Sequence, residues 1–133
     1  MPPRDVARVL AAGRIAIGAG LLAAPRLSLA MWIGRSAAGH AVAPVGRALG
    51  VREIVLGGML LHTLDRPQVG SRWLRMLAVC ETVDLAATLM AGRALPARGR
   101  ALVIAMAGAG AAGELWAAGE LAAGESPAPD GVA

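Results

Sequence analysis

The sequence contains no Phe and no Tyr, and only three Trp among its 133 residues. A soluble core of this size normally fills its volume with aromatic side chains, so their near absence argues against an ordinary soluble domain. The chain is nevertheless 56% hydrophobic, with a mean hydropathy of +0.59. Its bulk comes from Ala, Gly, Leu, Val and Ile, and such small residues suit close helix packing in lipid. We therefore expect a single integral membrane domain.

Lysine is absent as well, so all 13 basic residues are Arg. The net charge of +4 and the isoelectric point near 11.3 would fit a nucleic-acid-binding protein. Most of the Arg residues, however, lie at the ends of apolar stretches, where interfacial anchors are found, and not along one polar face. The single cysteine, Cys80, permits no intrachain disulfide and no cysteine-based metal site. We expect no nucleic-acid partner.

Four apolar stretches are long enough to cross a bilayer, which takes about 20 helical residues. They run from about residue 6 to 24, 45 to 64, 73 to 91 and 101 to 121. Short connections at 65–72 and 92–100 predict antiparallel neighbours, and residues 26–43 could hold a short helix with Trp32 at headgroup level. The fold class is therefore predicted to be all-α: a four-transmembrane-helix antiparallel bundle over residues 1–121, with an interfacial segment between helices 1 and 2. Residues 122–133 read as a disordered tail.

Six ionisable side chains interrupt these apolar stretches, and each costs a few kcal/mol at bilayer depth. Counting depth at about 1.5 Å per residue predicts two layers, the first formed by Arg14, Glu81 and Glu114 and the second by Arg52, Glu53 and Asp84. Glu81 and Asp84 are three residues apart and share a helix face, which Thr88 continues.

The two layers together contain four carboxylates and only two guanidinium groups. Because Arg stays charged at any depth, two carboxylates lack a cationic partner, and we expect at least one of the four to carry a proton near pH 7. A neutral acid beside a charged one is the arrangement that general acid–base catalysis uses. An alternative stays open, in which the charges form a structural network that fixes helix register.

The predicted catalytic residues are Asp84 and Glu81 as the central pair, completed by Glu53 and Glu114. Arg14 and Arg52 are expected to orient the carboxylates, Thr88 adds a polar atom, and Trp116 is close enough to Glu114 to line a cavity. A metal site is not predicted, because His62 and His40 are expected on opposite sides of the membrane. We expect no cofactor.

The run Gly50-Val51-Arg52-Glu53, followed by Leu56-Gly57, resembles an element of an uncharacterised family of small four-helix bacterial integral membrane proteins. In that family a Gly-x-Arg-Glu/Asp element opens the second helix, and an Arg-x-x-x-Gly stretch, here Arg14 to Gly18, lies in the first. The resemblance covers about residues 6–120. It implies the four-helix architecture and carries no activity with it.

These observations favour a multi-pass protein of the bacterial cytoplasmic membrane that catalyses epoxide opening, cyclisation or isomerisation of a lipophilic small molecule such as a terpenoid or polyketide. The expected partners are membrane lipid and that substrate, and the small-residue faces are compatible with a homo-oligomer. The alternative is a non-enzymatic small membrane subunit or a proton-coupled transporter, whose buried ion pairs are structural or relay protons.

Overall fold

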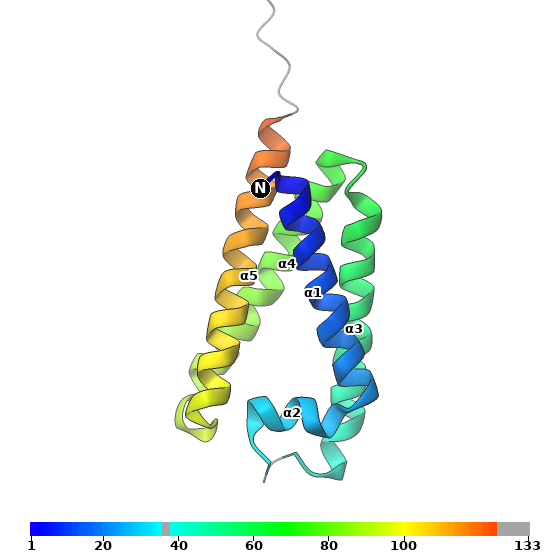
Figure 1. Ribbon diagram of the computed structural model, residues 1–133. Helices are drawn as coiled ribbons and strands as arrows, with labels where there is room; N and C mark the ends of the chain where they lie inside the picture. Colours follow the sequence, from blue (N-terminus) through cyan, green and yellow to red (C-terminus); the bar gives the residue numbers. More distant parts are fainter. Residues whose placement is uncertain (36–37, 125–133) are drawn as a thin grey trace, which may run out of the picture.

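The computed structural model describes residues 1–35 and 38–124 and contains five α-helices in those ranges (Figure 1). They are α1 (Pro3–Ala23), α2 (Pro25–Ile33), α3 (Ala43–Thr63), α4 (Pro67–Ala91) and α5 (Ala97–Ala123), with short 3-10 turns at His40–Val42 and Gly92–Ala94. The described part of the chain holds no strand, so the predicted all-α class is confirmed there.

Proline and glycine set most of the helix ends. Four of the five helices have Pro in their first turn, where its fixed φ suits the helix and its missing N–H is not needed. Gly34 and Gly92 follow α2 and α4 with positive φ angles of 86° and 53°, a conformation that glycine adopts without strain. Because Pro67 starts α4, that helix begins six residues before the predicted start, and most of the predicted 65–72 loop is helical.

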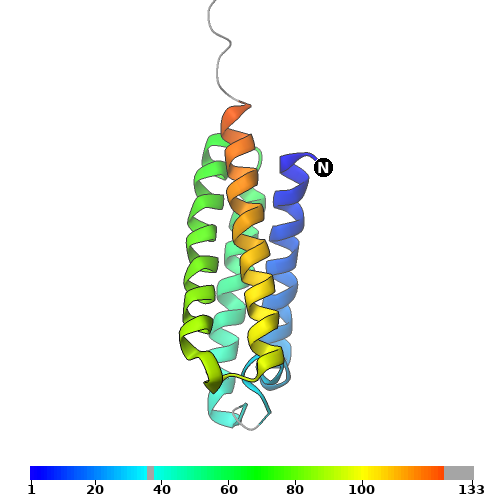
Figure 2. The same cartoon turned by 90° about the vertical axis from the view of Figure 1, so that its left-hand side faces the viewer.

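The four long helices form two pairs that run along one axis (Figure 2). α1 packs along α3, and α4 packs along α5, with fewer contacts between the pairs. Figure 1 shows the pairs close together at the end that holds the N-terminus and apart at the opposite end, where α2 lies across the opening. α2 contacts α1, α3 and α5.

Glycine backbones allow α1 and α3 to pack closely. A Cβ atom on Gly50 would lie 2.6 Å from the Gly18 carbonyl oxygen, and one on Gly57 would lie 2.7 Å from that of Ala11. Gly58, the next residue, has no atom within 4 Å of such a Cβ. The contact therefore depends on which glycine faces the neighbouring helix, as expected for small-residue packing between membrane helices.

An apolar core joins the two pairs at the end that holds the N-terminus. It comprises Ala7, Ala11, Leu60, Leu64, Leu74, Leu77, Ala117, Ala118 and Leu121. Within it, the Ser71 hydroxyl donates to the carbonyl oxygen of Ala118 at 2.7 Å. All four long helices contribute to this core, so it closes the bundle at that end.

Two helices, α1 and α5, are long and apolar enough to cross a membrane by length and composition. α3 and α4 have 21 and 25 residues, which is also long enough, but no window within either helix meets the same combined criterion of hydropathy and charge. The four-span topology is thus supported for two helices and stays a prediction for α3 and α4. α5 ends at Ala123, two residues beyond the predicted domain end. The rest of the predicted tail, residues 125–133, lies outside the described residues.

Candidate functional site

One arginine holds three carboxylates from three other helices. Arg14 Nη1 on α1 donates to Glu53 Oε2 on α3 at 2.7 Å, and Nη2 donates to Glu81 Oε1 on α4 at 2.7 Å. Nη2 and Nε both donate to Glu114 Oε1 on α5, at 2.8 and 3.2 Å. These four residues are called the Arg14 cluster below. Because it joins all four long helices, the cluster fixes how they face one another.

The helical repeat explains why these side chains meet. Arg14 shares the buried face of α1 with Ala7, Ala11, Gly18 and Leu21. In the same way, Glu53 shares the buried face of α3 with Gly50 and Gly57, and Glu114 shares that of α5 with Ala107 and Ala118. Spacings of three, four and seven residues place side chains on one stripe of a helix. Each charged side chain therefore faces the interior, between small neighbours that leave room for it.

The Arg14 cluster is deeply buried and its charges do not balance. Arg14 and Glu114 are only 6% and 1% exposed. One guanidinium group cannot neutralise three carboxylates when all are ionised. In addition, Glu114 Oε2 is buried and has no hydrogen-bond partner among the described residues. An unpartnered buried polar atom is destabilising, so this network is not complete by itself.

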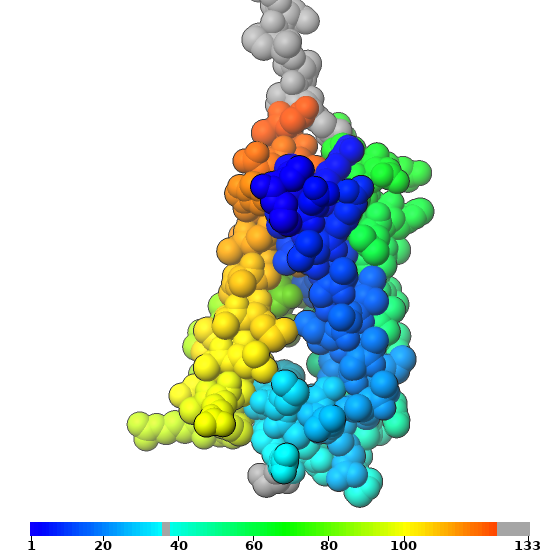
Figure 3. Space-filling view, viewed as in Figure 1, coloured from blue at the N-terminus to red at the C-terminus, as the bar shows by residue number. Residues whose placement is uncertain are grey.

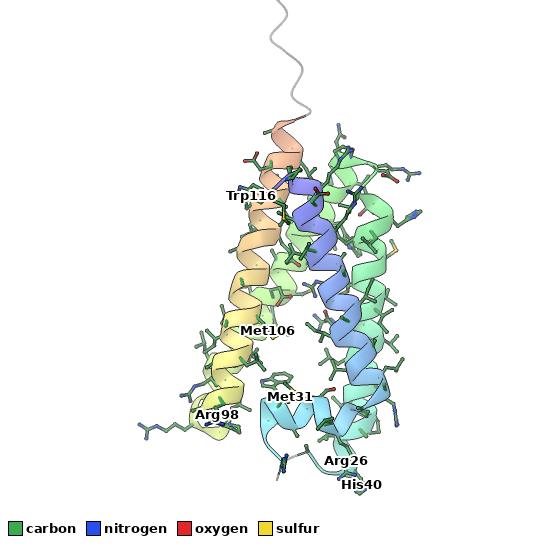
Figure 4. The ribbon with its side chains drawn as sticks, in the orientation of Figure 1. Arg26, Met31, His40, Arg98, Met106 and Trp116 are labelled. Carbon is green, nitrogen blue, oxygen red and sulfur yellow. The ribbon has the colours of Figure 1, made fainter. Side chains whose placement is uncertain are left out.

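A cavity of about 560 Å³ lies beside the Arg14 cluster. Its volume falls within the range of small-molecule sites, about 300–1,000 Å³. All four residues of the cluster line it, together with Asp84, and most of the remaining lining is apolar. Figure 3 shows the molecule hollowed between α1, α5 and α2. Met31 on α2 and Met106 on α5 border this opening (Figure 4).

The first predicted layer is present, since Arg14 contacts both Glu81 and Glu114. The second predicted layer is present only in part: Arg52 lies near Asp84, but it is exposed, and Glu53 turns to Arg14 instead. Adjacent residues on a helix point in different directions, so only one of Arg52 and Glu53 can face the interior. Glu53 does so because it is flanked by inward-facing glycines.

Two predicted substrate contacts are not at the cavity. Thr88 is buried, and its hydroxyl donates to the Asp84 carbonyl oxygen at 2.8 Å within its own helix. Trp116 is 46% exposed and lies on α5 well away from the opening (Figure 4). Neither residue lines the cavity, so neither is placed to contact a molecule bound there.

Trp32 belongs to the site, although the sequence analysis did not place it there. It lines the cavity, and its Nε1 atom is buried without a hydrogen-bond partner among the described residues; its position at headgroup level stays a prediction. Gly99 on α5 permits this position, since a Cβ there would clash with the Trp32 carbonyl oxygen. Neither the composition nor the periodicity of residues 26–43 shows that this helix folds against α5.

Within residues 1–35 and 38–124, no group of three or more His, Cys, Asp or Glu side chains is arranged to hold a metal ion. Comparisons of the chain with protein-family models, with curated proteins and with solved structures found no match. The chemistry of the site is therefore inferred from its geometry alone.

Proposed function

We propose that this protein is an integral membrane enzyme that binds a lipophilic small molecule in the cavity and acts on it by acid–base catalysis. The carboxylates at the polar end of the cavity would transfer the protons, and no cofactor is required. The observation that carries the proposal is a mostly apolar cavity lined at one place by four carboxylates and a single guanidinium group.

The distribution of side chains supports a membrane setting for all four long helices. Apolar side chains outside the cavity lining are exposed on each, with exposed fractions of 40% for Leu22 on α1, 54% for Val55 on α3, 63% for Val79 on α4 and 55% for Leu115 on α5. Water-soluble proteins rarely expose contiguous apolar surface on this scale. Charged groups at bilayer depth normally face the bundle interior, as the Arg14 cluster does. We therefore infer that α3 and α4 also span the bilayer.

The four carboxylates differ in burial and in ion pairing, so we assign them different roles. Glu114 and Glu53 are almost completely buried and are held by Arg14, so they position that guanidinium group and balance its charge. The Glu81 side chain is 18% exposed, and Asp84 forms no ion pair among the described residues. Both line the cavity. Glu81 and Asp84 are therefore the carboxylates best placed to exchange protons with a bound molecule.

Epoxide opening illustrates the proposed chemistry. One carboxylic acid of the Glu81–Asp84 pair donates its proton to the epoxide oxygen as the carbon–oxygen bond breaks. Water or a hydroxyl group of the substrate forms the new bond at that carbon, and its proton passes to the carboxylate of the pair. The pair then holds the same number of protons as before, so no oxidant, reductant or other reactant is needed. Arg14 keeps Glu81 in place throughout.

A transporter or a structural subunit is the alternative. A structural role is favoured by the fact that Glu53, Glu81 and Glu114 all pair with Arg14. A transporter opens its site to the two sides of the membrane in turn, and the apolar core that contains Leu60 and Leu74 closes one end of the bundle in this conformation. The cavity favours an enzyme over both, as does Asp84, which lines the cavity and is not among the carboxylates paired with Arg14.

The test is turnover by amide variants in purified, lipid-reconstituted protein. With a panel of terpenoid epoxides as probes, Glu81→Gln and Asp84→Asn should abolish opening to the diol or cyclised product, measured by mass spectrometry. Asp65→Asn and Glu120→Gln change exposed carboxylates outside the cavity and should leave turnover unchanged. Full activity in both Glu81→Gln and Asp84→Asn would reject the proposal.

A further inference from the structure

The charge of the cavity lining indicates which lipophilic molecules it can accept. We propose that the cavity selects ligands that carry a positive charge at one end of an apolar body, of which an alkylammonium ion is the simplest. The inference rests on the proposed function, because acid-catalysed epoxide opening develops positive charge on the substrate beside the carboxylates of the cavity.

The lining contains one cation and four potential anions. Arg14 is the only basic residue among the lining residues, and the acidic ones are Glu53, Glu81, Asp84 and Glu114. When all are ionised, three negative charges in the lining are unbalanced. Arg52, which lies near Asp84 outside the lining, offsets one of them, and protonation of one carboxylate still leaves an excess of negative charge. A bound cation would reduce this excess, whereas a bound anion would add to it. In a medium of low dielectric constant, the difference in electrostatic energy between a bound cation and a bound anion is larger than in water.

Arg14 is not free to bind an anionic ligand. Four of its hydrogen bonds go to carboxylate oxygens within the cluster, at 2.7–3.2 Å. A guanidinium group has only five N–H donors, so the carboxylates of the protein use nearly all of them. The positive charge is therefore held by Glu53, Glu81 and Glu114, and the cavity side of the cluster presents acceptors.

Two carboxylates that line the cavity have acceptor oxygens to which a ligand could donate or bring a positive charge. Glu114 is 1% exposed, lines the cavity, and has an Oε2 atom without a donor among the described residues. Asp84 lines the same cavity; Arg52 lies near it, but the two form no ion pair within residues 1–35 and 38–124. Trp32 adds an aromatic side chain to this lining, and aromatic faces attract ammonium groups. Together these features form a site with acceptors and a π surface, and Arg14, the cation of its lining, is already paired.

The experiment uses the full chain in nanodiscs of phosphatidylcholine and three probes of equal chain length. They are decyltrimethylammonium, its neutral isostere in which carbon replaces the ammonium nitrogen, and a decyl sulfonate anion. Trp73→Phe and Trp116→Phe leave Trp32 as the only tryptophan of the three, so its emission reports binding at the cavity. Protein-free nanodiscs correct for partitioning into lipid.

We expect decyltrimethylammonium to bind at least about tenfold more tightly than the neutral isostere, which corresponds to about 1.4 kcal/mol, and the sulfonate not to bind. Asp84→Asn should weaken ammonium binding about tenfold, and the exposed-site variants Asp65→Asn and Glu120→Gln should not change it. Asp84→Asn is the informative variant because Asp84 holds no ion pair in the described fold. Its removal should therefore leave the helices assembled, which size-exclusion chromatography verifies.

Equal affinity for the ammonium probe and its neutral isostere would overturn the inference and leave the proposed function to its own turnover test. Tighter binding of the sulfonate would also overturn it. Conversely, charge-selective binding that is lost in Asp84→Asn, together with undiminished epoxide turnover in the amide variants, would support the cation site and reject the proposed catalysis. The two failures are thus distinguishable.

Discussion

Replacement of Arg14 by Met should be among the most damaging single substitutions in this chain. The side chain of Arg14 is 7% exposed and makes ion pairs of 2.7, 2.7 and 2.8 Å with carboxylates on three helices. Removing one partner of a buried ion pair leaves an uncompensated buried charge and costs about 3–5 kcal/mol. Here three carboxylates lose the same partner, so the upper part of this range applies. Total stabilities are only about 5–15 kcal/mol.

Arg8 on the same helix provides a matched control. It pairs with Asp5 at 2.8 Å, but the two side chains are 58% and 45% exposed, and exposed pairs contribute about 0.2–1 kcal/mol. We expect Arg14→Met to lower the unfolding temperature by roughly 10 °C or more, since each kcal/mol shifts it by several degrees in a domain of this size. Arg8→Met should shift it by a few degrees at most.

The unfolding of detergent-solubilised protein can be followed with a thiol-reactive dye, because Cys80 is the only cysteine. Combining Arg14→Met with Glu114→Gln should recover part of the loss, because the double variant no longer leaves Glu114 charged and unpaired. The reasoning is refuted if Arg14→Met destabilises no more than Arg8→Met, or if the added Glu114→Gln change gives no recovery.

Three further outcomes are expected. Gly57→Leu should destabilise the protein by about 1–3 kcal/mol through overpacking, because a Cβ there would meet the Ala11 carbonyl oxygen at 2.7 Å, whereas Gly58→Leu should have little effect; thermal unfolding compares the two. Ser71→Ala should cost about 1 kcal/mol by the same assay, since its buried hydroxyl donates a 2.7 Å hydrogen bond. Gly99→Val should push α2 away from α5, and the emission of Trp32 should then shift while unfolding still occurs in one transition.

Much of the helical architecture could be predicted from the sequence. Apolar stretches of about 20 residues, bounded by proline and glycine, gave the four long helices. Counting depth from their ends brought Arg14, Glu81 and Glu114 to one level, and the structure joins them. These predictions succeed because helix rise and connection length are local properties that hold without knowledge of the packing.

Side-chain direction and the docking of α2 could not be predicted in this way. Depth alone placed Glu53 beside Arg52, but the rotation of α3 turns Glu53 to Arg14 instead. That rotation is set by the glycine face against α1, which is a tertiary contact. Likewise, the position of Trp32 depends on the absence of a side chain at Gly99, more than 60 residues later in the chain. Such long-range contacts leave no periodic signal in one sequence.

The proposed function requires that α4, with its acidic residues facing inward, lies in a bilayer. A nitroxide spin label at Val83, which is 59% exposed on α4, tests it most directly in lipid-reconstituted protein with Cys80 replaced by Ala. Accessibility to dissolved oxygen and to a water-soluble nickel chelate is measured by electron paramagnetic resonance, with a label at the exposed Asp65 for comparison. We predict that the label at Val83 is accessible to oxygen and shielded from nickel, and that the label at Asp65 is accessible to nickel. Strong nickel accessibility at Val83 would place α4 in water and rule out the proposed membrane enzyme.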